Sequence, residues 1–229
     1  MVSPQKRPQG KRYMAAGLAL IAGYVDAYGF ITFGTFVSFM SGNTTHAGSD
    51  IGGGFLKAAV PACLAIVSFV AGVFAATLLL TSRVRRRRAI QYAIIAALLG
   101  LTIAVTRLTS LTAPVFVIML GFTMGVMNTA LSRVGSQLVN VTFVTGTLSQ
   151  IGGHLARAWR GEALDDSEGP RDTHFARAML LTTVWLGFFS GALTGGALAP
   201  RLGVWMLSIP AAAMLILALW CFTGSDERP

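Results

Sequence analysis

The fold is decided by the stretch Phe36-Val37-Ser38-Phe39-Met40-Ser41-Gly42-Asn43-Thr44-Thr45-His46-Ala47-Gly48, which aligns without gaps on Asn140-Val141-Thr142-Phe143-Val144-Thr145-Gly146-Thr147-Leu148-Ser149-Gln150-Ile151-Gly152. Both segments are apolar at the front, break at a hydroxyl–glycine pair and are too short to cross a bilayer. In membrane proteins, short glycine-interrupted segments at corresponding places in two halves point to a transport site. The identical positions are Val37/Val141, Phe39/Phe143, Gly42/Gly146 and Gly48/Gly152.

Composition places the chain in a membrane. Apolar residues make up 54% of the sequence and charged residues 12%, which is typical of neither a soluble nor a disordered protein. A hydrocarbon core of about 30 Å needs about 20 apolar helical residues. We therefore expect one all-α integral membrane domain over residues 1–229, with six spans at roughly 14–33, 58–81, 89–106, 112–131, 178–198 and 203–222.

The net charge of +9 is distributed unevenly between the connections. Of the 18 Lys and Arg residues, only Lys57, Arg107 and Arg201 lie in one set of alternate connections, and the others lie at the N-terminus, the C-terminus and in the remaining connections. Basic residues concentrate on the cytoplasmic side of membrane proteins. The distribution predicts cytoplasmic N- and C-termini and a lipid bilayer, rather than nucleic acid, as the partner of this basic chain.

The similarity extends into the flanking spans and predicts two repeats, at about 13–106 and about 112–222, after a basic cytoplasmic segment at 1–12. Each repeat consists of a span, a short broken segment and two further spans. The matched pairs are Gly23/Gly125, Asp26/Asn128, Phe69/Phe188, Gly72/Gly191 and Ala76/Gly195.

Two topologies are compatible with such repeats. If both broken segments crossed fully, the repeats would be parallel and Arg83 and 85–88 would face outward. If both are re-entrant, the repeats are inverted and the basic residues gather inside, which the charge rule favours. We therefore expect inverted three-span repeats whose broken segments enter from opposite sides and meet near mid-membrane, where irregular backbone must be buried or line a water-filled cavity.

The candidate site consists of polar residues at the two breaks. Asp26 is the one acidic residue inside a predicted span, and such a carboxylate marks a pathway or proton relay or, alternatively, hydrogen-bonds an unwound backbone. Helix N-termini after each break favour an anionic ligand. Direct ligand contact and capping of the broken helices both remain open for the candidate substrate-binding residues, which are Ser41, Gly42, Asn43, Thr44, Asn128, Thr145, Gly146 and Thr147.

The remaining chemistry-bearing residues predict no enzyme, cofactor or metal site. His46 and His154 have no partners at metal-ligand spacing and are interpreted as loop histidines, and Cys63 and Cys221 as buried free thiols. No nucleophile, Walker or zinc-protease motif is present. A stripe of small residues serves either packing within the chain or a homodimer; it comprises Gly187, Gly191 and Gly195.

Three segments, Ala22-Gly23-Tyr24-Val25-Asp26-Ala27, Gly34-Thr35-Phe36-Val37 and Met40-Ser41-Gly42-Asn43-Thr44, resemble the signature of the YoaK-like family. Ser41 stands where that family has the Thr of its T-G-N motif. The resemblance implies a bacterial inner-membrane protein of a family without known function. From the residues we expect a secondary transporter of a small solute. The most specific version of this expectation is an anionic solute whose transport is coupled to a proton or another cation. The alternatives are a passive channel built from the two re-entrant segments and a non-transporting scaffold.

Overall fold

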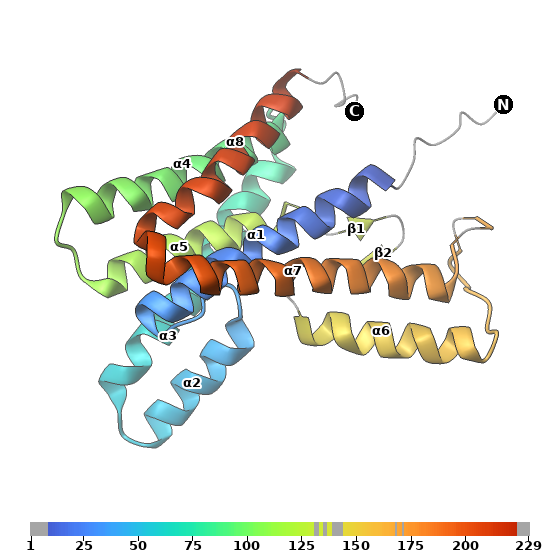
Figure 1. The fold of residues 1–229 in the computed structure, drawn as a ribbon, viewed down its shortest axis with the longest axis horizontal. Coiled ribbons are helices and arrows are strands. Elements are labelled where there is room, and N and C mark those ends of the chain that lie inside the picture. The colour runs from blue at the N-terminus through green and yellow to red at the C-terminus, as the bar shows by residue number, and fades with distance from the viewer. Residues whose placement is uncertain are drawn as a thin grey trace.

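In the described part of the protein, six apolar helices form the body and two further helices branch from it (Figure 1). The computed structural model describes residues 9–130, 133–134, 137–138, 144–167, 169–170 and 172–223. The six apolar helices in these ranges are α1 (Gln9–Phe33), α3 (Leu56–Thr81), α4 (Arg87–Leu108), α5 (Ala113–Asn128), α7 (His174–Leu202) and α8 (Ser208–Thr223). The short helices are α2 (Met40–Gly52) and α6 (Val144–Trp159), and the two-residue strands β1 (Arg133–Val134) and β2 (Gln137–Leu138) pair antiparallel.

Four stretches of the described chain are long and apolar enough to cross a membrane: Arg12–Phe33, Leu56–Thr81, Arg87–Leu108 and His174–Thr223. The last combines α7 and α8 through the 3₁₀ turn η1 (Gly203–Leu207). Helix α5 is apolar but has 16 residues, fewer than the span predicted at 112–131. The protein is a multi-pass membrane protein, as its composition predicts.

One end of the bundle, which we call end A, is defined by contacts among the start of α1, the start of α4 and the end of α8. The Tyr92 hydroxyl of α4 lies 3.7 Å from the Met14 sulfur of α1. The Arg86 guanidinium, just before α4, lies 5.9 Å from the centre of the Phe222 ring. Helices α1 and α4 therefore start at end A, and α8 finishes there.

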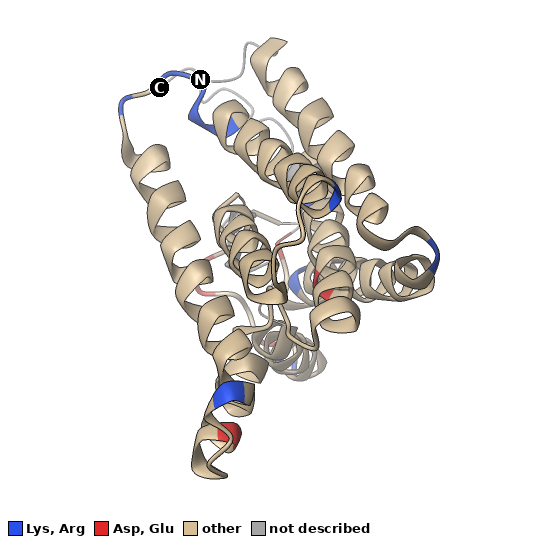
Figure 2. Cartoon of the chain, turned by 90° about the vertical axis from the view of Figure 1, so that its left-hand side faces the viewer, with Lys and Arg blue, Asp and Glu red and all other residues tan. Residues whose placement is uncertain are grey.

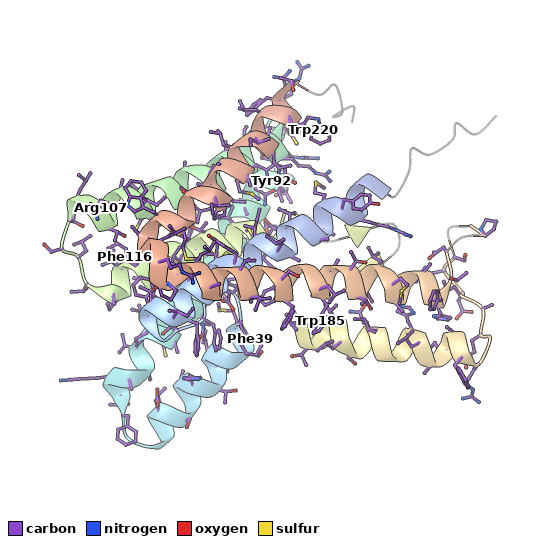
Figure 3. The ribbon with its side chains drawn as sticks, in the orientation of Figure 1. Phe39, Tyr92, Arg107, Phe116, Trp185 and Trp220 are labelled. Carbon is purple, nitrogen blue, oxygen red and sulfur yellow. The ribbon has the colours of Figure 1, made fainter. Side chains whose placement is uncertain are left out.

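The other end, end B, joins the end of α1 to the start of α5. The Phe33 and Phe116 rings stack with centres 6.0 Å apart, and Arg107 at the end of α4 lies 5.9 Å from the ring centre of Trp205 in η1. Figure 3 shows Arg107 and Phe116 on one side of the molecule, away from Tyr92 and Trp220. Helix α5 therefore runs opposite to α1.

Two extensive helix crossings, α1 with α7 and α3 with α5, are made through glycines. A Cβ atom at Gly23 would collide with the Phe188 carbonyl on α7, and one at Gly125 with the Phe69 carbonyl on α3. In the reverse direction, Gly191 meets the Leu20 carbonyl and Gly72 the Phe122 carbonyl. Glycine permits this close approach because it has no Cβ. The residues matched from the sequence therefore occupy equivalent places in both crossings.

The same crossing accounts for the stripe of glycines on α7. Gly187, Gly191 and Gly195 each face the backbone of α1, at Ala16, Leu20 and Tyr24 respectively. The stripe therefore packs within the chain, which is one of the two alternatives that the sequence allows. A homodimer through these glycines stays a prediction, and this face of α7 is already occupied.

Apolar side chains cover both the inside and much of the outside of the bundle. Tyr92, Leu120 and Met124 are buried between helices, whereas Phe74 and Leu193 are more than 60% exposed. Figure 2 shows that the helix surface in view is almost entirely uncharged. An exposed apolar belt is expected where helices contact lipid hydrocarbon.

Candidate functional site

Asp26 organises the break between α1 and α2. One carboxylate oxygen accepts hydrogen bonds from the backbone N–H groups of Val37, at 2.8 Å, and Ser38, at 2.7 Å. The residue is 6% exposed and lies on α1, seven residues before that helix ends at Phe33. The chain after α1 therefore turns back along the helix and is held beside it by this carboxylate.

The N–H groups of Val37 and Ser38 explain how the protein can bury the Asp26 carboxylate. A buried charge is tolerated when hydrogen bonds replace the lost water. Close approach also needs a small residue on α1, because a Cβ at Gly29 would lie 2.7 Å from a methyl carbon of the fully buried Val37. Asp26 therefore hydrogen-bonds an unwound backbone, which is one of the two roles that the sequence allows.

Within the first polar cluster, Asn43 is the residue that faces the break. It is 1% exposed, and its side-chain N–H donates to the Phe36 carbonyl at 2.6 Å. Ser41 and Thr44 lie on the exposed face of α2, where the Thr44 hydroxyl donates to the Met40 carbonyl. Gly42 is half-buried against the Phe39 ring. Helix α2 begins without a side-chain cap.

The second cluster lies on α6 and at the end of α5. Thr147 is 5% exposed, Thr145 is exposed and Gly146 is half-buried. Asn128 is half-buried at the last position of α5. The front of the second repeat segment, 140–143, lies outside the described residues.

The two clusters branch from the bundle in different directions. Helix α2 packs extensively against α3 and α6 against α7, and no comparably extensive contact joins α2 to α6 in the described chain. The structure therefore brings Asp26 and Asn43 to one break but does not pack Ser41, Gly42 and Thr44 against the α6 cluster. Figure 1 shows α2 and α6 projecting away from each other below α1 and α7.

Helix lengths place the starts of both short helices part-way along their partners. At about 1.5 Å per residue, the 13 residues of α2 cover half of the 26-residue α3, and the 16 residues of α6 about half of the 29-residue α7. A short turn joins α2 to α3. Helix α3 runs parallel to α5, because Gly121 meets Ala65 and Gly125 meets Phe69, and it therefore starts at end B. Helix α6 leads toward the start of α7 at end A. Both helices thus begin part-way along the bundle and run to opposite ends.

Gln91 is a polar residue of the site region that motif reasoning missed. Its side chain is fully buried on α4 and donates through Nε2 to the Val126 carbonyl at 2.9 Å and to the Thr129 hydroxyl at 2.7 Å. Its carbonyl oxygen has no hydrogen bond to any described residue. Gln91 thereby stabilises the end of α5 beside Asn128. The available signal was a glutamine inside the predicted span 89–106.

The interpretation of His154 as a loop histidine is wrong. His154 lies on α6, is 8% exposed, and its Nδ1 is 2.8 Å from Nδ1 of His174, which is 6% exposed at the start of α7. Arg177, one turn further on α7, forms ion pairs with Asp166 at 2.9 Å and Asp172 at 2.8 Å. The loop interpretation is also wrong for His46, which lies on α2 but is exposed.

Comparison with known proteins places the chain in a family. Residues 14–220 match the model of the family described as "Protein of unknown function (DUF1275)". The chain belongs to this family. It is 33% identical over 229 residues to the UPF0700 transmembrane protein RA0705 of Rhizobium meliloti (strain 1021), covering 96% of this chain and 93% of the relative. No solved structure matches. The expectation of an uncharacterised membrane-protein family is thus confirmed.

The described residues of this DUF1275 member include no cluster of side chains suited to binding a metal ion. Among the described residues, no group of three or more His, Cys, Asp or Glu side chains is arranged to hold a metal ion. Cys63 on α3 and Cys221 on α8 form no disulfide with any described residue and are half-buried, whereas the sequence predicted buried thiols. What the site offers is hydroxyls, amides, one anchored carboxylate and the N-termini of two helices.

Proposed function

We propose that the protein is a secondary transporter of a small anionic solute in the bacterial inner membrane, with Asp26 as a proton-coupling residue. The observation that carries this proposal is the break held by Asp26, from which α2 starts part-way along the bundle and runs out to end B. Its counterpart α6 runs to end A. Opposed half-helices of this kind line the substrate sites of transporters built from inverted repeats.

The directions of the long helices support six crossings in two inverted repeats. Helix α7 runs parallel to α1, because Gly187, Gly191 and Gly195 meet α1 in increasing residue order. Helix α3 is parallel to α5 in the same way. Each helix of the first repeat, α1, α3 or α4, then runs opposite to its counterpart, α5, α7 or α8.

The charge distribution supports a cytoplasmic end A. Arg12 at the start of α1, the arginines between α3 and α4 and those at the end of α6 belong to end A, whereas Lys57, Arg107 and Arg201 belong to end B. The positive-inside rule then favours end A in the cytoplasm. Helix α2 would open to the outside and α6 to the inside.

The helix N-termini support an anionic substrate. The positive end of a helix dipole favours negative charge. At α2 the Asp26 carboxylate supplies part of that charge through Val37 and Ser38, just before the helix starts, and the N-cap residue Phe39 adds no side-chain cap. Asn43, Asn128 and Thr147 would supply neutral hydrogen-bonding groups near these starts, and Ser41, Gly42, Thr44, Thr145 and Gly146 would line the exposed faces. Protonation of Asp26 would weaken its acceptance of the Val37 and Ser38 N–H groups and so loosen the break, which is how a proton would couple to movement.

Flux measurement in liposomes tests the proposal. A thermal-shift screen of the purified protein against small anions selects a substrate, because a ligand stabilises the folded state. Uptake of that anion should saturate and accelerate with an inward proton gradient. In Asp26→Asn, which keeps a side-chain carbonyl acceptor but cannot titrate, uptake should lose its response to the gradient. Asp50→Asn, which removes a carboxylate at the far end of α2, is the matched control and should respond like the wild type.

Each other outcome contradicts part of the proposal. Flux that rises without saturation would identify a channel, and no flux of any anion that stabilises the protein would identify a scaffold. Proton-driven uptake that survives in Asp26→Asn would exclude Asp26 as the coupling residue. An Asp26→Asn protein that fails to assemble would show that the carboxylate is required for structure.

A further inference from the structure

Helix α6 is held to the bundle on one side. Its extensive contacts in the described chain are with α7, and the polar residues it buries are Thr147 near its start and His154 one turn before its end. The exposed face of α6 carries Leu155 and Trp159, which are 41% and 92% exposed. The contact between His154 and His174 therefore lies at the distal part of a single helix–helix interface.

The geometry of the two rings limits how many protons they can share. The Nδ1 atoms are 2.8 Å apart, a distance at which one nitrogen must carry the hydrogen and the other must accept it. Two neutral rings satisfy this arrangement, and so does one neutral ring with one charged ring. Two charged rings do not, because both Nδ1 atoms would then be donors and both rings positive.

We propose that His154 and His174 form a proton-operated latch, which holds α6 against α7 at neutral pH and releases α6 when both rings become protonated. The latch is a regulatory device additional to transport. Its consequence for Thr145 and Thr147, which move with α6, rests on the proposed function, whereas the latch itself requires no substrate.

The charged groups around the pair set the direction of the response. Arg177 faces it from α7 and Arg157 from α6, while Asp166, in the connection after α6, pairs with Arg177; Asp172, before α7, also pairs with Arg177. Burial lowers the pKa of His154, the neighbouring His174 and two arginines lower it further, and Asp166 opposes them with a smaller effect.

The sign of the pH dependence follows from this lowered pKa. Because the docked ring binds a proton less readily than a solvated ring, the released state holds more protons below the ordinary histidine pKa of about 6.5. Falling pH therefore shifts α6 toward release, and docking is strongest above that pH. The response falls within the range in which histidine acts as a physiological switch.

Hydrogen–deuterium exchange of the full chain in lipid nanodiscs tests the latch without any substrate. The amide protection of residues 144–159, corrected for intrinsic exchange, is compared at about pH 8 and about pH 5, on either side of the histidine pKa. Protection of α6 should fall at the lower pH, by up to about tenfold for each pH unit below the ordinary histidine pKa. Protection of α4, which contains no histidine, aspartate or glutamate, should not change.

Histidine variants separate the latch from other acid effects. His154→Gln combined with His174→Gln retains hydrogen-bonding groups but cannot titrate, so α6 protection should be the same at both pH values. His46→Gln is the matched control and should keep the wild-type loss. Unchanged α6 protection in the wild type, or the same acid-induced loss in the double variant, would overturn the proposal.

The single variant His174→Gln tests the latch even if α6 no longer docks in the double variant. In His174→Gln, a protonated His154 can donate to the glutamine carbonyl, but burial and the two arginines still lower its pKa, so α6 should lose less protection at about pH 5 than in the wild type. A loss as large as that of the wild type would contradict the latch. Exchange is measured without substrate or solute gradient, so its result does not depend on transport. The latch proposal can therefore be supported where the transport proposal fails, and the reverse.

Discussion

The two short helices α2 and α6 begin alike and end differently. Asn43 and Thr147, 104 residues apart, are both buried in the first turns of their helices. Near the far ends, Asp50 is half-exposed, whereas His154, again 104 residues later, is buried against His174. The repeat thus preserves packing at the break, while the chemistry of the distal ends has diverged.

Helices α1 and α5, which precede α2 and α6, also share their packing and differ in their chemistry. Gly23 of α1 and Gly125 of α5 make equivalent contacts with a partner helix, yet three residues later the first repeat has Asp26 and the second Asn128. Glycine is retained because any Cβ would separate the helices, and that constraint applies equally in both repeats. A proton-binding group needs to be present in only one.

The largest effect should come from the shared packing. Gly23→Ala and Gly125→Ala each place a Cβ against a backbone carbonyl that cannot rotate away, and overpacking costs about 1–3 kcal/mol or more. We expect both variants to lower the thermal unfolding midpoint in detergent by similar amounts. Gly17→Ala, in α1 with open space at its Cβ, is the control and should be neutral or stabilising. If Gly23→Ala proved as stable as this control, the two crossings would not be the tight contacts described.

A smaller net loss of stability should follow removal of the anchor that distinguishes the first repeat, because the same change also removes the cost of burying a carboxylate. Asp26→Ala leaves the N–H groups of Val37 and Ser38 without their acceptor, and an unsatisfied buried donor costs about 1–3 kcal/mol. Asp26→Asn should lose less, because its carbonyl oxygen still accepts. Thermal unfolding of the three proteins should rank wild type, Asn, then Ala, while Asp50→Ala leaves the midpoint unchanged. Equal stability of Asp26→Ala and wild type would mean that the break does not depend on the carboxylate.

How far the structure could be predicted from sequence depends on the range of the interaction. The matched pairs Gly23/Gly125 and Gly72/Gly191 predicted the equivalent positions in the two crossings, because close helix packing requires glycine wherever it recurs. The partner of His154 could not be predicted, since His174 follows after a polar connection and no periodic pattern relates them. The hydroxyl clusters of α2 and α6 were expected to meet, but α2 packs against α3 and α6 packs against α7. Similarity between the two segments does not show which helix each of them packs against.

Labelling from one side of the membrane should separate α2 from α6 without a measurable effect on stability. Ser49→Cys on α2 and Ala156→Cys on α6 place thiols at exposed positions near the far ends of these helices, in a chain whose Cys63 and Cys221 are replaced by alanine. With end A in the cytoplasm, an impermeant maleimide applied to intact cells should label Ser49→Cys only, and permeabilised cells should allow both to react. Labelling of both thiols in intact cells would mean that α2 and α6 open to the same side and that the repeats are not inverted, whereas labelling of Ala156→Cys only would retain the inversion and reverse the orientation.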